Sequence, residues 1–485
     1  MNQATSLSTK PYVYAMQVPR SALYRCWLDD EEHCVVDSVK AHVVRAAGDS
    51  HVQVTIACQQ PIESVVVRPL ALGIKPTHDG AKFSFTLETH ASISIEINDD
   101  LNAPLLLFWD APVQTPEPDA LTTIFRAGEV HHVGELVVAS EQRIFLEGGA
   151  VVRGQLKIDR ATNVRVWGPG ILDQSTRTVP MYTVHVRHSS NVILEDILLL
   201  DTYGWSLHLE YSNHIDINRV RIIGTRGNSD GIDVVSSSHV AIRNCFLKTL
   251  DDCIAIKSGN FETEDSQTME DVVVTNSVMW NEIPGNAMEV GFELNNRLVK
   301  GIHFNNCDII HVLRGAAFSI HNSGGAHVED VSFENIRLED VRDEFVDLYI
   351  GLSIYSKDCP HEFFRLNPDR RPVPQHRRDN VSPDNSEQWL LATNAQENSQ
   401  IAAKRGSISN VRFRNIRFVG GPIRIVIKGY DEAHAISNVS FSDISCDGNA
   451  MSHWPQDMVR IEHAKDVVFA GQDMCTTAAH TRPMQ

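Results

Sequence analysis

The sequence predicts an all-β protein in which a small N-terminal β-sandwich precedes a long parallel β-helix. Two observations indicate this architecture. Residues 1–112 alternate short β-rich runs with breaks of Asn, Asp, Gly and Pro, a spacing typical of antiparallel sandwiches. From about residue 120 onward, units of about 22 residues repeat with several short strands each and no helical period.

The N-terminal region supplies the first part of the prediction. Runs such as "HVQVTIAC", "KFSFTLE" and "SISIEIN" have the alternation of half-buried strands. Residues 113–122, "VQTPEPDALT", are polar and contain two prolines, which favours a linker. We therefore assign residues 1–112 to the sandwich and residues 123–485 to the solenoid domain.

The repeat supplies the second part. The segments "NHIDINRVRIIGTRGNSDGIDVVSS" and "SHVAIRNCFLKTLDDCIAIKSG" share one layout of strand, Asn- or Asp-bearing turn, second strand, break and third strand. This unit is too short for a propeller blade and lacks the leucine-rich template, so a parallel β-helix from about 120 to about 450 is predicted. Residues 357–405 are polar, Pro-rich and non-periodic, and read as an insertion.

Composition limits the partners. The formal charge of −19, from 62 acidic and 43 basic residues, argues against a nucleic acid or an anionic membrane as a partner. No export signal and no membrane span is recognisable. The nine cysteines form no CxxC pair and are interpreted as reduced. The cytoplasm is the expected compartment, or the exterior if a signal has been removed, and the oligomeric state stays open.

Stacking the repeats predicts which side chains point outward. Residues one coil apart stack in a β-helix, so inward pairs such as Ile232/Val234 and Ile254/Ile256 fix the outward positions by period-two alternation. Three outward columns result, namely Trp205, Asp230, Asp252, Asn286 and Ala316; His208, Asp233, Ala255, Glu289 and Ser319; and Glu210, Val235, Lys257, Gly291 and His321.

Three carboxylates converge in these columns. Asp230 and Asp252 stack on adjacent coils, with Asp251 at the bend beside them. Because like charges repel, one of the three should hold its proton to higher pH than a free aspartic acid. A protonated carboxyl beside a carboxylate is what glycosidic cleavage requires. Capping of turn amides and calcium binding are the alternatives, and no metal or cofactor motif is present.

The other candidates surround this cluster and are predicted to bind substrate. Trp205 offers a face for stacking on a sugar ring. Glu289 is an outward acid that could contact ligand hydroxyls, and Lys257 either neutralises the acids or reaches the ligand. The full set of substrate-binding candidates is Asn228, Lys257, Asn286, Glu289, His321, His208, Trp205 and Asp233.

"GNSDGIDVVSS" followed by "TLDDCIAIKSG" resembles glycoside hydrolase family 28, the polygalacturonases and their relatives, from about residue 130 to 345. The resemblance implies a right-handed parallel β-helix that hydrolyses with inversion. It implies Asp251 as the general acid, with Asp230 and Asp252 activating the water, at a separation of roughly 6.5 to 9.5 Å from acid to base.

Two departures from the family pattern guide the expected substrate. Asn286 stands where the family has the His of Gly-His-Gly, and Ser319-Ile320-His321 stands where it has Arg-Ile-Lys. In the family, that Arg and Lys hold the uronate carboxylate, which Ser and His replace poorly. A neutral sugar is therefore predicted, and dextranase-like family 49 is a second resemblance. The missing export signal favours intracellular oligosaccharides and hence exo-action, while the sequence leaves the choice between endo- and exo-action open. A polygalacturonase, a polysaccharide lyase and a non-catalytic glycan-binding β-helix stay as alternatives.

Overall fold

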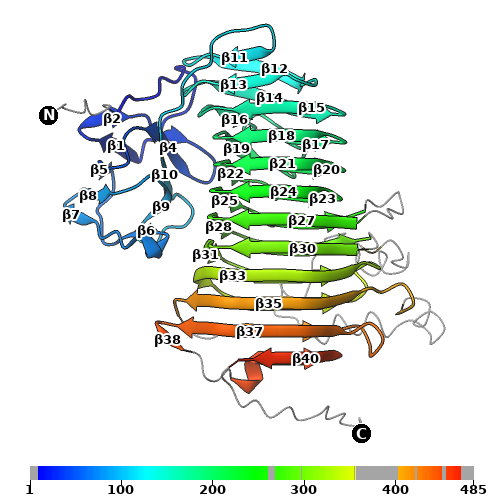
Figure 1. Ribbon diagram of the computed structural model, residues 1–485. Helices are drawn as coiled ribbons and strands as arrows, with labels where there is room; N and C mark the ends of the chain where they lie inside the picture. The colour runs from blue at the N-terminus through cyan, green and yellow to red at the C-terminus, as the bar shows by residue number, and fades with distance from the viewer. Residues whose placement is uncertain are drawn as a thin grey trace, which may run out of the picture.

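The computed structural model describes residues 9–259, 268–295, 298–353, 356, 402–420, 423–450 and 455–470. Regular structure in these residues is nearly all β, which confirms the predicted fold class. The strands form two five-stranded sheets followed by one sheet of 30 strands (Figure 1). No helix in the described part of the chain is long and apolar enough to cross a membrane.

The first ten strands build the sandwich. One sheet has the order β2-β1-β5-β8-β7 and the other β3-β4-β10-β9-β6. Most pairs are antiparallel as predicted, but β4 and β10 pair in parallel. The strands are β1 (Tyr24–Leu28), β2 (Glu31–His33), β3 (Val36–Asp37), β4 (His42–Ala47), β5 (Val52–Cys58), β6 (Val65–Arg68), β7 (Thr77–Asp79), β8 (Lys82–Leu87), β9 (Ala91–Ile97) and β10 (Leu105–Asp110), with one 3-10 turn, η1 (Leu70–Leu72).

The remaining strands wind into coils. Corresponding strands of successive coils pair in parallel and form three faces. Face A carries the strand heads that hold the acids, and consists of β17 (Val184–Arg187), β20 (Leu207–Glu210), β23 (Ile232–Val235), β26 (Ile254–Ser258), β29 (Met288–Leu294), β32 (Ala316–Asn322), β34 (Glu344–Ile350), β36 (Arg424–Lys428) and β39 (Val459–Glu462). Face B consists of β11 (Thr122–Phe125), β13 (Arg143–Leu146), β15 (Thr162–Trp167), β18 (Ser190–Glu195), β21 (Asn213–Asn218), β24 (Ser238–Arg243), β27 (Thr268–Thr275), β30 (Leu298–Asn305), β33 (His327–Val341), β35 (Ser407–Phe418), β37 (Ile436–Cys446) and β40 (Ala464–Phe469).

Face C lies against the sandwich. It consists of β16 (Ile171–Asp173), β19 (Leu198–Thr202), β22 (Arg221–Gly224), β25 (Phe246–Thr249), β28 (Val278–Asn281), β31 (Asp308–Val312) and the second half of β33. Strands β12 (Val130–Val137) and β14 (Val151–Asp159) span faces C and A, and β38 (Asn449–Ala450) and η3 (Gln456–Met458) lie near the end. Phe108 of the sandwich packs edge-on against Phe246 of face C, with ring centroids 5.3 Å apart.

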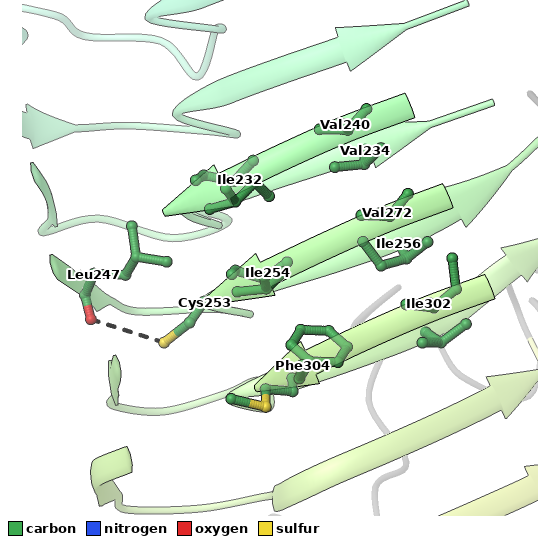
Figure 2. Close-up of a cluster of buried hydrophobic side chains, with 14 of the residues drawn as sticks. Ile232, Val234, Val240, Leu247, Cys253, Ile254, Ile256, Val272, Ile302 and Phe304 are labelled. Atoms are coloured by element: carbon green, nitrogen blue, oxygen red, sulfur yellow. Dashed lines mark hydrogen bonds between the residues drawn. The ribbon is translucent and has the colours of Figure 1, made fainter. Parts of the chain in front are cut away.

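The core of the solenoid follows from the repeat. Ile232 stacks on Ile254 in the face A register, and both are fully buried. Figure 2 shows both among the buried side chains of one cluster, together with Val240 and Val272 of face B. Each such branched side chain contributes about 1.5–3 kcal/mol on burial. Because alternate side chains of these strands point into the core, the side chains between them face outward.

The solenoid continues beyond the predicted end at about residue 450, since β40 ends at Phe469. Of the predicted insertion at 357–405, residues 357–401 lie outside the described residues. Arg405 is described and buried. Its Nη1 donates to the carbonyl oxygen of Ser323 at 2.7 Å, so this end of the segment is attached to the coil that carries β32.

Candidate active site

The register of face A pairs the same residues that stacking the sequence repeats predicted. His208 lies beside Asp233, Asp233 beside Ala255, and Ala255 beside Glu289, which lies beside Ser319. Val235 likewise lies beside Lys257. Outward residues of successive coils are therefore neighbours about 4.8 Å apart, and the predicted columns run along one face.

The three predicted catalytic acids come together at the strand heads. Asp230 precedes β23, and Asp251 and Asp252 precede β26. One carboxylate oxygen from each lies within 4.8 Å of the other two. Asp230 and Asp252 are buried, at 3% and 7% exposed, whereas Asp251 is half-buried. Asp251 is therefore the acid that presents the most surface.

Close packing of the coils holds the Asp251–Asp252 peptide. The Asp251 carbonyl oxygen accepts hydrogen bonds from Thr249 Oγ1 at 2.6 Å and from Asn281 Nδ2 at 2.7 Å. Gly285 lies directly against this peptide, and a Cβ there would approach the Asp251 carbonyl carbon to 2.5 Å. Its φ of +107° is one that side-chain-bearing residues rarely adopt, so glycine is needed at this position.

Lys257 is the cation of the cluster. Its Nζ lies 2.8 Å from Asp233 Oδ1 and 3.3 Å from Asp230 Oδ2. The same ammonium lies 3.8 Å from the centroid of the Trp205 ring, a cation–π contact. Lys257 is buried, so it neutralises the acids, which is one of the two roles predicted for it, and is not extended toward an open groove.

One cation does not balance four neighbouring carboxyl groups. Burial and then Asp233 raise the pKa of Asp230 well above its ordinary value, although Lys257 acts in the opposite direction. Burial, Asp251 and Glu289 likewise raise the pKa of Asp252. Burial opposes a charged Lys257, yet Asp233 and Asp230 raise its pKa well above the usual range. The cluster therefore keeps its ammonium and tends to retain a proton on a carboxyl.

Asn286 connects Asp252 to the next coils. Its backbone N–H donates to Asp252 Oδ1 at 2.7 Å, and its Nδ2 lies 3.3 Å from the same oxygen. Nδ2 also donates to Glu289 Oε2 at 3.0 Å. The Asn286 Oδ1 accepts from the N–H of Ala316 at 2.9 Å. Both ends of the amide are thus oriented by neighbouring groups.

Glu289 lies at the centre of a buried network. Ser319 Oγ donates to its Oε2, and His321 Nδ1 lies 3.0 Å from its Oε1. On its other side, His321 Nε2 lies 3.0 Å from Asp347 Oδ2. Glu289 is 0% and His321 2% exposed, so hydrogen bonds between side chains, and not open solvent, surround these groups.

An aromatic cluster lies on the N-terminal side of the acids. Trp205 and His208 meet edge to face at 5.1 Å, Tyr182 lies 4.3 Å from His208, and His185 stacks on His208 at 5.0 Å and 6°. Burial lowers the pKa of His208 to about 3, so its imidazole is neutral. Trp205 stays half-buried, with one ring face against Lys257.

The outward direction predicted for the substrate-binding candidates does not leave all eight side chains exposed. Asn228 is exposed, in a left-handed turn with φ of 56°, and Trp205 is half-buried. The other six are buried, because period-two alternation gives direction but not depth: Lys257, Asn286, Glu289, His321, His208 and Asp233. Their roles in substrate binding stay predictions.

Stacking the repeats also missed neighbours of the site. His185 and Asp347 extend the middle column at its two ends, beside His208 and Ser319. The pattern of "VHVR" at 184–187 matches "LHLE" at 207–210 and could have revealed His185. In the same way, "FVDLYI" at 345–350 continues the alternation of "AFSIHN" at 317–322. Tyr182 lies before β17, and no periodic signal marks it.

Comparisons with known proteins agree with the fold and with the family resemblance. Residues 126–348 match the family described as "Glycosyl hydrolases family 28". This match covers Asp230, Asp251 and Asp252, and confirms the resemblance seen in "GNSDG" and "LDDC" over that segment. A β-helix with this family's aspartates supports assignment to the glycoside hydrolases.

Individual relatives are distant and partial. A probable polygalacturonase of Arabidopsis thaliana is 27% identical over 168 residues, which is 33% of this chain and 34% of that protein. A probable endopolygalacturonase D of Neosartorya fischeri is 22% identical over 247 residues, 50% of this chain and 44% of that protein. The chain thus spans less than half the length of these two relatives.

Among solved structures, Dex49A from Penicillium minioluteum superposes with a TM-score of 0.57 at 10% sequence identity, covering 95% of this chain and 96% of that one. At this identity the likeness concerns the fold alone. It extends over nearly the whole chain and agrees with the second resemblance, to family 49.

Proposed function

We propose that this protein is a glycoside hydrolase that cleaves a poly- or oligosaccharide with inversion at the anomeric carbon. The carrying observation is the convergence of Asp230, Asp251 and Asp252 within 4.8 Å beside a single neutralising Lys257. Such a cluster combines a carboxyl that keeps its proton with a carboxylate that loses it, the two states that glycosidic hydrolysis uses.

The roles follow from exposure and from the hydrogen-bond partners. Asp251 presents the most surface of the three acids, so it is the group that can reach the leaving oxygen as general acid. Asp230 is held by Lys257, and Asp252 by the backbone N–H of Asn286. A fixed, buried pair is better suited to holding a water than to attacking a sugar carbon directly. Asp230 and Asp252 are therefore proposed to activate the water through whichever of the two is ionised, since their raised pKa values favour one proton held between them.

The stereochemical outcome is the finer part of this proposal. One carboxylate oxygen of each acid lies within 4.8 Å of those of the other two, whereas the general inverting scheme predicts carboxyl groups roughly 6.5 to 9.5 Å apart. A retaining reaction, with one buried aspartate as nucleophile, is the direct competitor. The anomer formed first distinguishes the two.

The first substrate candidate is a galacturonan, because the relatives bear the name polygalacturonase. The predicted preference for a neutral sugar finds no support in these relatives. It stays a second candidate for one reason, which is that Ser319 and His321 lie in a network with two acids, Glu289 and Asp347. Such a network offers little attraction to a uronate carboxylate.

The proposal is tested by incubating the purified protein with polygalacturonate, oligogalacturonides and neutral α- and β-glucans. Proton NMR during the first turnovers should show hydrolysis of one class, with the product anomer opposite to that of the bond cleaved. Product length separates exo- from endo-action. Unsaturated products absorbing in the ultraviolet would indicate a lyase, and binding without cleavage of any glycan would contradict the enzyme assignment.

A further inference from the structure

We propose that Glu289 is a positioning residue that acts on Asp252 through the amide of Asn286. This inference rests on the proposed function, because it gives Glu289 a part in the same acid site. It replaces the predicted contact of Glu289 with substrate by a structural contact with another protein group.

Hydrogen bonds connect Glu289 to Asp252 through Asn286. Glu289 Oε2 accepts from Asn286 Nδ2 at 3.0 Å, and Asn286 donates through its backbone N–H to Asp252 Oδ1 at 2.7 Å. An amide has one donor end and one acceptor end. With Oδ1 accepting from the N–H of Ala316, Nδ2 has to point toward Glu289 and Asp252. Glu289 and the N–H of Ala316 therefore together fix which end of the amide faces the catalytic acid.

Neighbouring side chains hold the Glu289 carboxylate by hydrogen bonds. This carboxylate accepts from three side chains on two coils, namely Asn286 on its own coil and Ser319 and His321 on the next. It is 0% exposed, so no part of it is available to a sugar in this arrangement. A buried carboxylate is tolerated where such donors surround it. These partners fit a positioning residue better than a substrate-binding one.

The negative charge of Glu289 also acts on the ionisation of Asp252. The charged and titratable groups facing Asp252 are Asp251 on its own coil, Asp230 on the coil before, Glu289 on the coil after, and Lys257. Glu289 contributes a negative charge that favours the protonated form of Asp252. Removal of that charge should thus lower the pH at which Asp252 becomes a carboxylate.

Geometry and charge can be separated with two substitutions. In Glu289→Gln, the amide oxygen can still accept from Asn286, while its NH₂ faces His321, whose ring nitrogen can accept. We expect kcat within about threefold of the unmodified protein, and the acid limb of kcat/KM moved to lower pH. In Glu289→Ala, the acceptor is lost, and kcat should fall by roughly tenfold to a hundredfold, since misplacement by about 1 Å has that effect. KM should change little.

Asn286→Ala serves as the second route to the same defect. If Glu289 acts through Asn286, kcat of the double variant Glu289→Ala/Asn286→Ala should be no lower than that of Asn286→Ala alone. Such non-additivity is expected of groups in one network. Glu344→Gln is the matched control, because Glu344 is also a buried glutamate on face A, paired with Arg424. It should leave kcat and the pH profile unchanged.

The deciding measurement does not depend on turnover. Asp252 is followed by carbon-13 NMR in protein labelled at the aspartate carboxyl carbons, with its signal assigned by Asp252→Asn. We expect its titration midpoint to move to lower pH in Glu289→Gln and its chemical shift to change in Glu289→Ala. An unmoved Asp252 signal in both variants, or a rise in KM at constant kcat in Glu289→Ala, would overturn the proposal. Absence of glycan cleavage by the unmodified protein would instead count against the proposed function alone.

Discussion

Two buried charge clusters of this protein differ in their balance. Where the sandwich meets face C, Arg68 and His311 lie against Glu96, Glu339 and Asp340, with Arg342 on the outer side. Three basic groups thus face three acids there.

At the strand heads of face A, four aspartates share Lys257. Matched charges stabilise an interface, whereas an excess of buried acid costs stability and raises pKa values. The comparison agrees with a structural role for the first cluster and with the catalytic role proposed for the second.

The largest expected effect is on activity. Asp251→Asn removes the proposed general acid, so hydrolysis should fall by about 10²- to 10⁴-fold while the thermal unfolding temperature stays unchanged or rises. Initial rates and calorimetry on the same preparation measure both. The control is Asp216→Asn on face B, where Asp216 pairs with Arg243 at the surface, and full activity is expected. An active Asp251→Asn would end the assignment of this residue.

The next effect concerns stability. Arg221 of face C is buried and pairs with Asp110 of the sandwich. Arg221→Ala leaves the buried Asp110 carboxylate with Arg45 as its remaining partner, 3.5 Å away, which should lower the free energy of unfolding by up to about 3–5 kcal/mol. The activity of the folded fraction should be unchanged. Chemical denaturation measures the loss, with the surface residue Arg243→Ala as the control, and equal losses in the two variants would argue against a structural role for the Arg221–Asp110 pair.

The sequence predicted more of the fold than of the site. Alternation in "IDVV" and "IAIK" sets which side chains point inward, and so it predicted the register that stacks Asp233 on Ala255. The alternation could not predict how deeply the outward side chains are buried. Burial of Glu289 and His321 depends on Asp347 and Phe292, the latter stacked on His321 at 4.3 Å, and such contacts between coils have no period in the sequence.

A third expected effect is a shift in pH dependence. Lys257 lowers the pKa of Asp230 against the opposing effect of burial. In Lys257→Met the pKa of Asp230 should therefore rise further, and the acid limb of kcat/KM should move to higher pH, since the proposed base has to be ionised. Lys300→Met, on face B and paired with Glu270, is the control. An unmoved limb in Lys257→Met would show that Asp230 is not the group titrating.

The smallest expected effect is a pH dependence of stability. Burial alone would lower the pKa of His311, but hydrogen bonds with Asp340 and Glu96 raise it. A raised folded-state pKa stabilises the fold fully below the unfolded value of about 6.5, and this stabilisation is lost as the pH rises through the folded value. Thermal unfolding over this pH range should show the decline in the unmodified protein and a weaker one in His311→Gln. If the unfolding temperature declines with pH as steeply in His311→Gln as in the exposed control His214→Gln, the assignment of this decline to His311 is wrong.

The most direct test of the account is the stability and activity of Asp252→Asn at neutral pH. Burial, Asp251 and Glu289 raise the pKa of Asp252, so its ionised form destabilises the fold, while an asparagine keeps an oxygen for the N–H of Asn286. The variant should unfold at a higher temperature than the unmodified protein and hydrolyse no glycan. A lower unfolding temperature together with retained hydrolysis would show that the acid cluster is structural and that the catalytic site lies elsewhere.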